Sequence, residues 1–150
     1  MLAAFTLVWG LDSFLLKLTT IPGSVPWPFR LVACAGFITA GSYLVYMSHR
    51  LVIDEVMDPV LVDWGVYGLV RHPMYLGIQL CYLGVASSTV SLASFLVLGF
   101  VFLVYNRFAE FEEKELTGAL GQQYLEYMRR VPRWVPSYGS KRHALLNVYQ

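Results

Sequence analysis

The sequence predicts an all-α polytopic membrane protein with about four transmembrane helices and a cytosolic amphipathic helix near the C-terminus. Of its 150 residues, 57% are hydrophobic and only 14% are charged, whereas soluble domains carry about 25% charged residues. The apolar residues gather in long runs that short polar or proline-containing stretches separate. These observations indicate that lipid, and not water, surrounds most of the chain.

The first two apolar runs begin what we interpret as a single membrane domain over residues 1–150. The run 1–18 comes close to the roughly 20 residues that a helix needs to cross a bilayer, and it lacks the basic start and cleavage site of a signal peptide. It contains Asp12, whose carboxylate must be neutral or paired at depth unless the helix lies shallow. Three prolines predict a loop over 21–28, and the second span follows over 30–48.

The last two spans give the main architectural prediction. They cover residues 73–87 and 92–106, and the short stretch between them has room only for a turn. The two helices therefore form a tight antiparallel hairpin, whose outer ends lie on one side of the membrane. Nine of the eleven Lys and Arg residues fall on that side. The positive-inside rule assigns this side, and with it both termini, to the cytoplasm.

The segment that follows, residues 107–150, is predicted to be a cytosolic lid and tail. Residues 107–117 are rich in charge, and Gly118 and Gly121 interrupt the chain after them. A set of apolar residues then recurs at helical spacing and predicts an amphipathic helix that covers the cytoplasmic mouth of the bundle. These residues are Leu120, Tyr124, Tyr127, Met128 and Val131.

The segment Gly65–Gly77 gathers an arginine, a histidine and two tyrosines around Pro73. Proline has a fixed φ and no backbone N–H, so it suits the first turn of a helix. The helix N-terminus behind Arg71 and His72 carries free N–H groups and partial positive charge, which attract a carboxylate or a phosphate. The alternative is a membrane-interface cap, in which the same side chains only anchor the helix end.

Several site classes find little support in the composition. The formal charge of +1 gives no reason to expect a nucleic acid partner. Cys34 and Cys81 both lie in apolar runs, and we interpret them as packing residues. The connector between the second and third spans holds four carboxylates, but apolar residues interrupt them and no metal-ligand spacing emerges. These are Asp54, Glu55, Asp58 and Asp63.

Two motifs resemble the isoprenylcysteine carboxyl methyltransferase family, a branch close to the phospholipid N-methyltransferases. The first motif combines Gly65–Tyr67 with Arg71–Gly77, and the second starts at Glu112-Glu113 and continues through residues 120–132. A helical hairpin separates the two motifs, and the resemblance covers about residues 59–136. The first two spans show no recognisable match.

The family consists of integral membrane enzymes that use S-adenosylmethionine. The resemblance therefore implies methyl transfer to a lipophilic acceptor, either an isoprenylcysteine-like carboxylate or a lipid amine. A family arginine near the end of the last span helps to hold the acceptor; Phe108 stands at that place here, and Arg107 is the nearest arginine. The family's cofactor-contacting positions fall on Pro59, Val60, Leu61, Val62, Tyr67, His72, Pro73, Met74, Tyr75 and Glu112, and no metal is implied.

The residue chemistry agrees with a site of this kind. The helix N-terminus near His72 suits the cofactor's carboxylate, Glu112 can accept a hydrogen bond from its amino group or ribose, and residues 60–62 with Tyr67 offer a slot for adenine. A general acid/base pair of Glu112 and Glu113 competes with this interpretation. Adjacent helical residues point about 100° apart, so the two would not converge on one substrate atom. An amine or thiol acceptor would make His72 or Glu113 a candidate base.

Two other functions stay open at this stage. Sterol reductases have a similar Arg-x-Pro-x-Tyr region and bind NADPH, but they tend to have asparagine where this chain has Met74. Alternatively, the chain is a non-catalytic helical membrane subunit, since its small residues favour helix association. Selective thermal protection by S-adenosylhomocysteine or by NADPH would separate the two enzyme classes.

Overall fold

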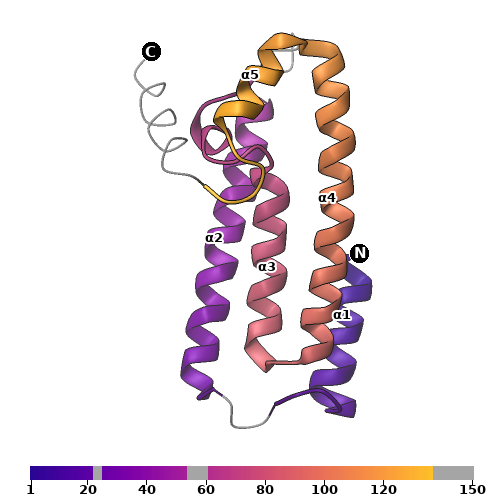
Figure 1. Ribbon diagram of the computed structural model, residues 1–150. Coiled ribbons are helices and arrows are strands. Elements are labelled where there is room, and N and C mark those ends of the chain that lie inside the picture. The colour runs from indigo at the N-terminus through magenta and orange to yellow at the C-terminus, as the bar shows by residue number, and fades with distance from the viewer. Residues whose placement is uncertain (22–24, 54–60, 137–150) are drawn as a thin grey trace. The chain divides into compact units, whose positions relative to one another are not determined.

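The computed structural model describes residues 1–21, 25–53 and 61–136, and within these ranges every regular element is helical (Figure 1). An isolated bridge between Thr20 and Ser91 is the one β-type pairing recorded there. The elements are α1 (Leu2–Gly10), the π-helix η1 (Leu11–Leu16), α2 (Trp27–Ile53), the 3₁₀-helix η2 (Gly65–Gly68), α3 (Pro73–Thr89), α4 (Leu92–Leu120) and α5 (Gln122–Arg130).

Two of these helices are long and apolar enough to cross a membrane, by length and composition. They are α2 over Trp27–Val52 and α4 over Leu92–Leu120. The helical stretch Leu2–Leu16 and α3, with 17 residues, are shorter. That these two shorter segments also cross the membrane, as the expected total of four spans requires, therefore stays a prediction.

The chain divides into two compact units, residues 1–42 with 77–106 and residues 43–76 with 107–150. In the first unit, the core joins α1, α3 and α4 through Phe5, Tyr82, Ala86 and Val101, which are all buried. The ring centroids of Phe5 and Tyr82 lie 4.6 Å apart. Burial of such large side chains supplies most of the favourable free energy of packing.

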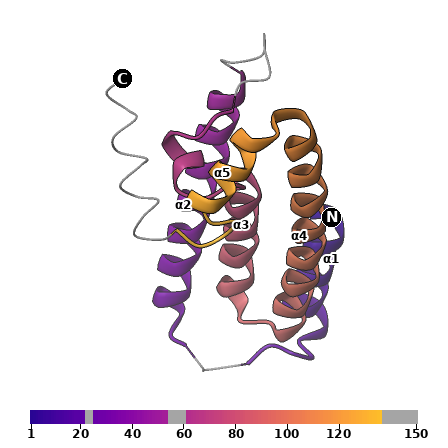
Figure 2. The ribbon, with the colours of Figure 1, turned by 45° about the horizontal axis from the view of Figure 1, so that its top comes forward.

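A two-residue turn, Val90 and Ser91, joins α3 to α4, and the two helices run side by side through the first unit in both views (Figures 1 and 2). The turn that the sequence predicts after residue 87 is therefore present, with α3 reaching Thr89. Val90 adopts a left-handed conformation with φ of 52°. This reversal brings the start of α4 back against the helix that precedes it.

Asp12 is buried in η1, and hydrogen bonds surround its carboxylate. Thr19 donates to it from its backbone N–H at 3.1 Å and from its hydroxyl at 2.6 Å, and the Ser91 hydroxyl donates at 2.6 Å. Of the three arrangements considered for this carboxylate, the structure has it paired within the unit. The pairing links the end of the first helix to the α3–α4 turn.

Close helix contact in the first unit involves Gly41, one of the small residues in the second predicted span. A Cβ added to Gly41 of α2 would lie 2.5 Å from the Gly77 carbonyl oxygen and 2.7 Å from Cys81 Sγ. Gly36, another glycine of this helix, has open space where its Cβ would be. The helices α2 and α3 also approach closely at Gly84 of α3, where an added Cβ would lie 3.0 Å from the Cys34 carbonyl oxygen.

In the second unit, α2 extends to Ile53 and α4 to Leu120, beyond the predicted ends at residues 48 and 106. Gly118 lies inside α4 and does not interrupt it, because a single glycine costs a long helix only about 1 kcal/mol. The break comes at Gly121, whose φ is 57°. The helix α5 follows and buries Tyr124 and Tyr127.

The substitution Gly41→Ala is expected to destabilise the protein by about 1–3 kcal/mol, because its new methyl group would overlap the α3 backbone. Gly36→Ala is the matched control, and we expect it to be neutral or to stabilise by up to about 1 kcal/mol through helix propensity. Thermal unfolding of the detergent-solubilised variants measures both effects. Equal behaviour of the two variants would contradict the close contact at Gly41.

Candidate functional site

The side chain of Glu113, on α4, is the centre of an ionic cluster in the second unit and is only 5% exposed. Arg71 Nε donates to its Oε1 atom at 2.9 Å, and Arg133 Nε donates to the same atom at 3.1 Å. Arg133 Nη2 donates to Oε2. His72 Nε2 lies 3.1 Å from Oε1. Both carboxylate oxygens are therefore engaged, as a buried charge requires.

Local structure explains how these side chains meet. Pro73 begins α3, and Arg71 and His72 are the two residues before it. Proline disfavours a helical conformation in the residue that precedes it. Arg71 and His72 therefore stand at the helix entrance, where their side chains reach Glu113 on α4.

His72 lies between two carboxylates. Its Nδ1 atom is 3.5 Å from Glu112 Oε2, while its Nε2 atom is 3.1 Å from Glu113 Oε1. Burial lowers the pKa of His72, but the hydrogen bonds and negative charges of both glutamates outweigh burial and raise that pKa above its ordinary value. The Tyr75 ring stacks on the imidazole with ring centroids 5.5 Å apart.

The two glutamates diverge as the sequence predicts, but they still act on one group. Adjacent positions on α4 point about 100° apart, and an imidazole also directs its two nitrogens to different sides. Glu112 and Glu113 therefore hold one ring from two directions. With a proton on each nitrogen, His72 satisfies both carboxylates as a donor.

Glu113 is a strongly ionised carboxylate. Burial raises its pKa, but hydrogen bonds from His72 and Arg133, together with the charges of Arg71 and Arg133, lower the pKa to about 2. A carboxylate of this kind holds cations in place and is a poor proton acceptor near neutral pH. This geometry argues against Glu113 as a general base.

Arg71 also holds the chain that follows α5. Its Nη1 atom donates to the carbonyl oxygens of Met128 and Val131, at 2.8 and 2.9 Å. Its backbone N–H donates to the Pro132 carbonyl oxygen at 2.9 Å. These bonds satisfy acceptors at a helix C-terminus, where no backbone donors remain. One guanidinium thus joins the α3 entrance, α4 and the end of α5.

A tyrosine cluster completes the described part of the second unit. The Tyr127 hydroxyl donates to the Tyr67 carbonyl oxygen at 2.8 Å, and Leu61 packs against Tyr124 and Tyr127. Burial raises the pKa of Tyr124 to about 12. Burial, with the nearby Glu112 charge, also raises the pKa of Tyr67, although a hydrogen bond with Ser48 opposes this shift.

The predicted site residues divide into three groups. His72, Tyr75 and Glu112 come together at the cluster, while Pro73 is fully buried beside them. Tyr67, Val62 and Met74 are half-buried in the same unit and Leu61 packs under α5, whereas Pro59 and Val60 lie outside the described residues. Arg107 lies at the edge of the cluster: its side chain is 81% exposed and pairs at 3.0 Å with Glu110, which also lies near Arg133.

Sequence reasoning missed the structural partners of the cluster. Arg71 and Glu113 belong to the two motifs of the resemblance, and Glu113 is also a candidate base, but the sequence does not predict that these two residues pair with each other or that Glu113 pairs with Arg133. One signal was available, because a buried glutamate needs cations and this chain places basic residues just before Pro73 and just after Pro132. Of the four connector carboxylates, Asp63 is the one in the described ranges, and it pairs with Arg130 at 3.2 Å.

Comparisons with known proteins agree with the resemblance seen in the motifs. The sequence model of a family described as phospholipid methyltransferase matches residues 28–123. Protein-S-isoprenylcysteine O-methyltransferase B of Arabidopsis thaliana is 35% identical over 102 residues, which are 66% of this chain and 49% of that protein. Its A form is 33% identical over 110 residues, covering 71% and 53% of the two chains.

A bacterial relative has a different acceptor in its name. Methanethiol S-methyltransferase of Pseudomonas sp. (strain GM41(2012)) is 32% identical over 110 residues, which are 67% of this chain and 42% of that protein. The chain thus spans about half the length of the curated relatives it matches. The relatives that share this region are enzymes whose names specify different methyl acceptors.

Glu113→Ala is expected to destabilise the second unit by about 3–5 kcal/mol, because it leaves Arg71, Arg133 and His72 without their common anion. Since the pKa of Glu113 is lowered from 4.5 to about 2, its stabilising contribution is complete above pH 4.5 and is lost as the pH falls toward 2. Unfolding curves between pH 7 and 2 measure this. An equal acid-induced loss in wild type and Glu113→Gln would contradict the assignment.

The imidazole of His72 is expected to titrate with a midpoint above 6.5, the value for an unperturbed histidine. Glu112→Gln removes one of the two carboxylates and should lower this midpoint. Nuclear magnetic resonance of histidine-labelled protein measures both values. A midpoint below 6.5 in the wild type would mean that desolvation dominates at this site.

Proposed function

Because the chain belongs to the phospholipid methyltransferase family, we propose that it is an S-adenosylmethionine-dependent membrane methyltransferase acting on a lipophilic acceptor. The arrangement of His72 between two glutamates carries this proposal, since it brings the two motifs of the resemblance together in one unit. The family match covers the first motif and the start of the second, and the rest of the second motif directly follows the matched residues. The names of the relatives support the same reaction class.

The residues at the cluster fit a zwitterionic nucleoside cofactor. Glu112 is 46% exposed although it contacts the buried His72, so its carboxylate can still accept a hydrogen bond from an amino or ribose hydroxyl group. The first turn of α3 supplies N–H groups for the cofactor's carboxylate. Val62, Tyr67 and Met74 offer apolar surface for adenine.

The cofactor supplies an activated methyl group on a sulfonium when it is bound. The chain's own contribution is to orient the two reactants in line and to exclude water, which lowers the barrier by several kcal/mol. Charge is dispersed during such a transfer, so this mechanism places little demand on an oxyanion hole. Arg71 and Glu113 serve as positioning residues that hold the α3 entrance against α4 and the end of α5.

The geometry favours an acceptor that loses no proton. His72 has a carboxylate at each nitrogen and a raised pKa, while Glu113 has a pKa of about 2. Neither group is poised to remove a proton at neutral pH. A carboxylate acceptor needs no base, and an isoprenylcysteine-like carboxylate is therefore our first candidate. Arg107 remains the proposed acceptor-orienting residue, because its guanidinium is exposed and can pair with a carboxylate.

The membrane arrangement is part of this proposal. We propose one domain with four spans, of which α2 and α4 have the length and composition to cross a bilayer. The basic residues of the second unit favour its placement on the cytoplasmic side, with both termini there. A lipophilic acceptor would then enter from the bilayer, between helices.

Binding of S-adenosylhomocysteine to the purified protein tests the cofactor site. We expect it to raise the unfolding temperature, whereas NADPH has no effect. His72→Ala and Glu112→Ala should each weaken binding about tenfold, since each removes one charge-assisted contact. Arg129→Gln, an exposed change on α5, is the matched control. Unchanged affinity in both alanine variants would defeat the site assignment, and protection by NADPH alone would favour the reductase alternative.

A transfer assay with labelled cofactor extends the same experiment to the acceptor. We expect methylation of a farnesylcysteine carboxylate, and a raised KM for that acceptor in Arg107→Ala. Transfer to a thiol but not to the carboxylate would contradict the acceptor assignment while leaving the reaction class intact. If the protein binds neither S-adenosylhomocysteine nor NADPH and a larger partner co-purifies with it, the alternative of a non-catalytic subunit is supported.

A further inference from the structure

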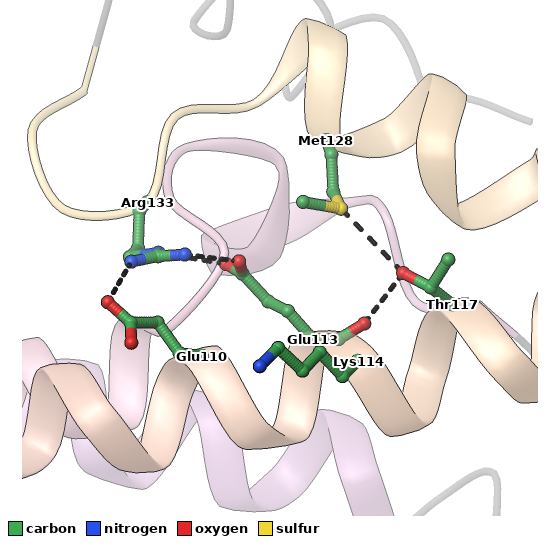
Figure 3. A pocket seen from close by; sticks show the side chains of 6 residues that line it. All are labelled: Glu110, Glu113, Lys114, Thr117, Met128 and Arg133. Atoms are coloured by element: carbon green, nitrogen blue, oxygen red, sulfur yellow. Dashed lines mark hydrogen bonds and ion pairs between the residues drawn. The ribbon is translucent and has the colours of Figure 1, made fainter.

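A second feature of the second unit is an open pocket between α4 and the chain around α5 (Figure 3). Its volume is about 410 Å³. One face of α4 forms its floor, because four of the lining residues follow each other at helical spacing. The lining residues are Glu110, Glu113, Lys114, Thr117, Met128 and Arg133.

The charges in this pocket are unevenly matched. Arg133 pairs with Glu113 and lies 3.6 Å from Glu110, which also pairs with Arg107. Glu113 in addition holds Arg71. Lys114 is exposed and forms no ion pair with any residue in the described ranges. Among the described residues that line the pocket, Lys114 is therefore a cation without a paired carboxylate, whereas Arg133 is 26% exposed and pairs with Glu113.

The rest of the lining is suited to an apolar group. The Thr117 hydroxyl donates to the Glu113 carbonyl oxygen at 2.6 Å and lies 3.9 Å from Met128 Sδ. Its polar atom is thus already engaged within the helix. The Met128 side chain and the aliphatic stem of Lys114 add further apolar surface.

The Lys114 side chain runs back along α4 toward Glu110, as the close view shows (Figure 3). Helical side chains lean toward the N-terminus of their helix, and in α4 that direction leads to the apolar stretch that ends near Tyr105. Lysines at the ends of apolar helices extend in this way to the membrane surface. In the membrane arrangement proposed above, on which this step rests, its ammonium is directed to the depth at which lipid head groups lie.

We propose that this pocket binds a phosphate group through Lys114 and Arg133, and that the phosphate belongs to the head group of an anionic membrane lipid. The site is separate from the proposed cofactor site, because Glu112 points about 100° away from Glu113 and does not line the pocket. Glu113 lies between the two sites. The proposal does not depend on the chain being a methyltransferase.

The test uses the full chain in detergent, with short-chain phosphatidylglycerol as the probe and the phosphatidylcholine of equal chain length as the reference. We expect phosphatidylglycerol to raise the unfolding temperature, and Lys114→Gln to weaken its apparent affinity about tenfold, as expected for one lost charge-assisted hydrogen bond. Lys114→Arg should restore binding. Arg129→Gln removes an equal charge from exposed α5 and should leave the affinity unchanged.

Each contrary result has a distinct meaning. Equal weakening by Lys114→Gln and Arg129→Gln would reduce the effect to general surface charge and overturn the site. Competition by S-adenosylhomocysteine would overturn the separation from the cofactor site. Inorganic phosphate that matches phosphatidylglycerol in both shift and Lys114 dependence would support the phosphate chemistry but overturn the lipid source. Cofactor binding by Lys114→Gln should stay at the wild-type level, which confirms that this variant is folded.

Discussion

Within the described part of the second unit, the Glu113 carboxylate of α4 binds cations from the α3 entrance and from the chain after α5, so three segments meet at this anion. Arg71 and His72 bring the entrance of α3 to it, and Arg133 brings the chain that follows α5. A buried carboxylate is costly unless it is fully paired, so these partners and this anion require one another. The same guanidinium that holds Glu113 also caps the end of α5 through Met128 and Val131. The described contacts therefore hold the α3 entrance, α4 and the end of α5 together through one carboxylate.

This anchoring has a chemical effect on the histidine beside it. A carboxylate at each ring nitrogen keeps His72 a double donor when it is protonated, and its raised pKa extends the pH range of that state. Such a residue orients groups and stabilises charge. When a methyl group is transferred from an activated donor, alignment of the reactants and exclusion of water matter more than proton transfer.

The sequence predicts much of this arrangement because its strongest signals are local. Pro73 predicts the start of α3, and the short stretch 87–91 between two apolar runs predicts the hairpin. Helix ends are less predictable: the charged residues after residue 106 indicate the end of a span, whereas the helix α4 continues to Leu120. Pairing across distance was the least predictable feature, since periodicity does not show that Arg133 would meet Glu113.

The Asp12 carboxylate ties the first helix to a part of the chain that is synthesised much later. One of its donors is Ser91, which comes after α3. Until that residue emerges, only Thr19 is present to donate to this carboxylate. The last of these hydrogen bonds therefore forms only when the α3–α4 turn reaches the N-terminal helix, which couples the packing of the first unit's earliest and latest segments.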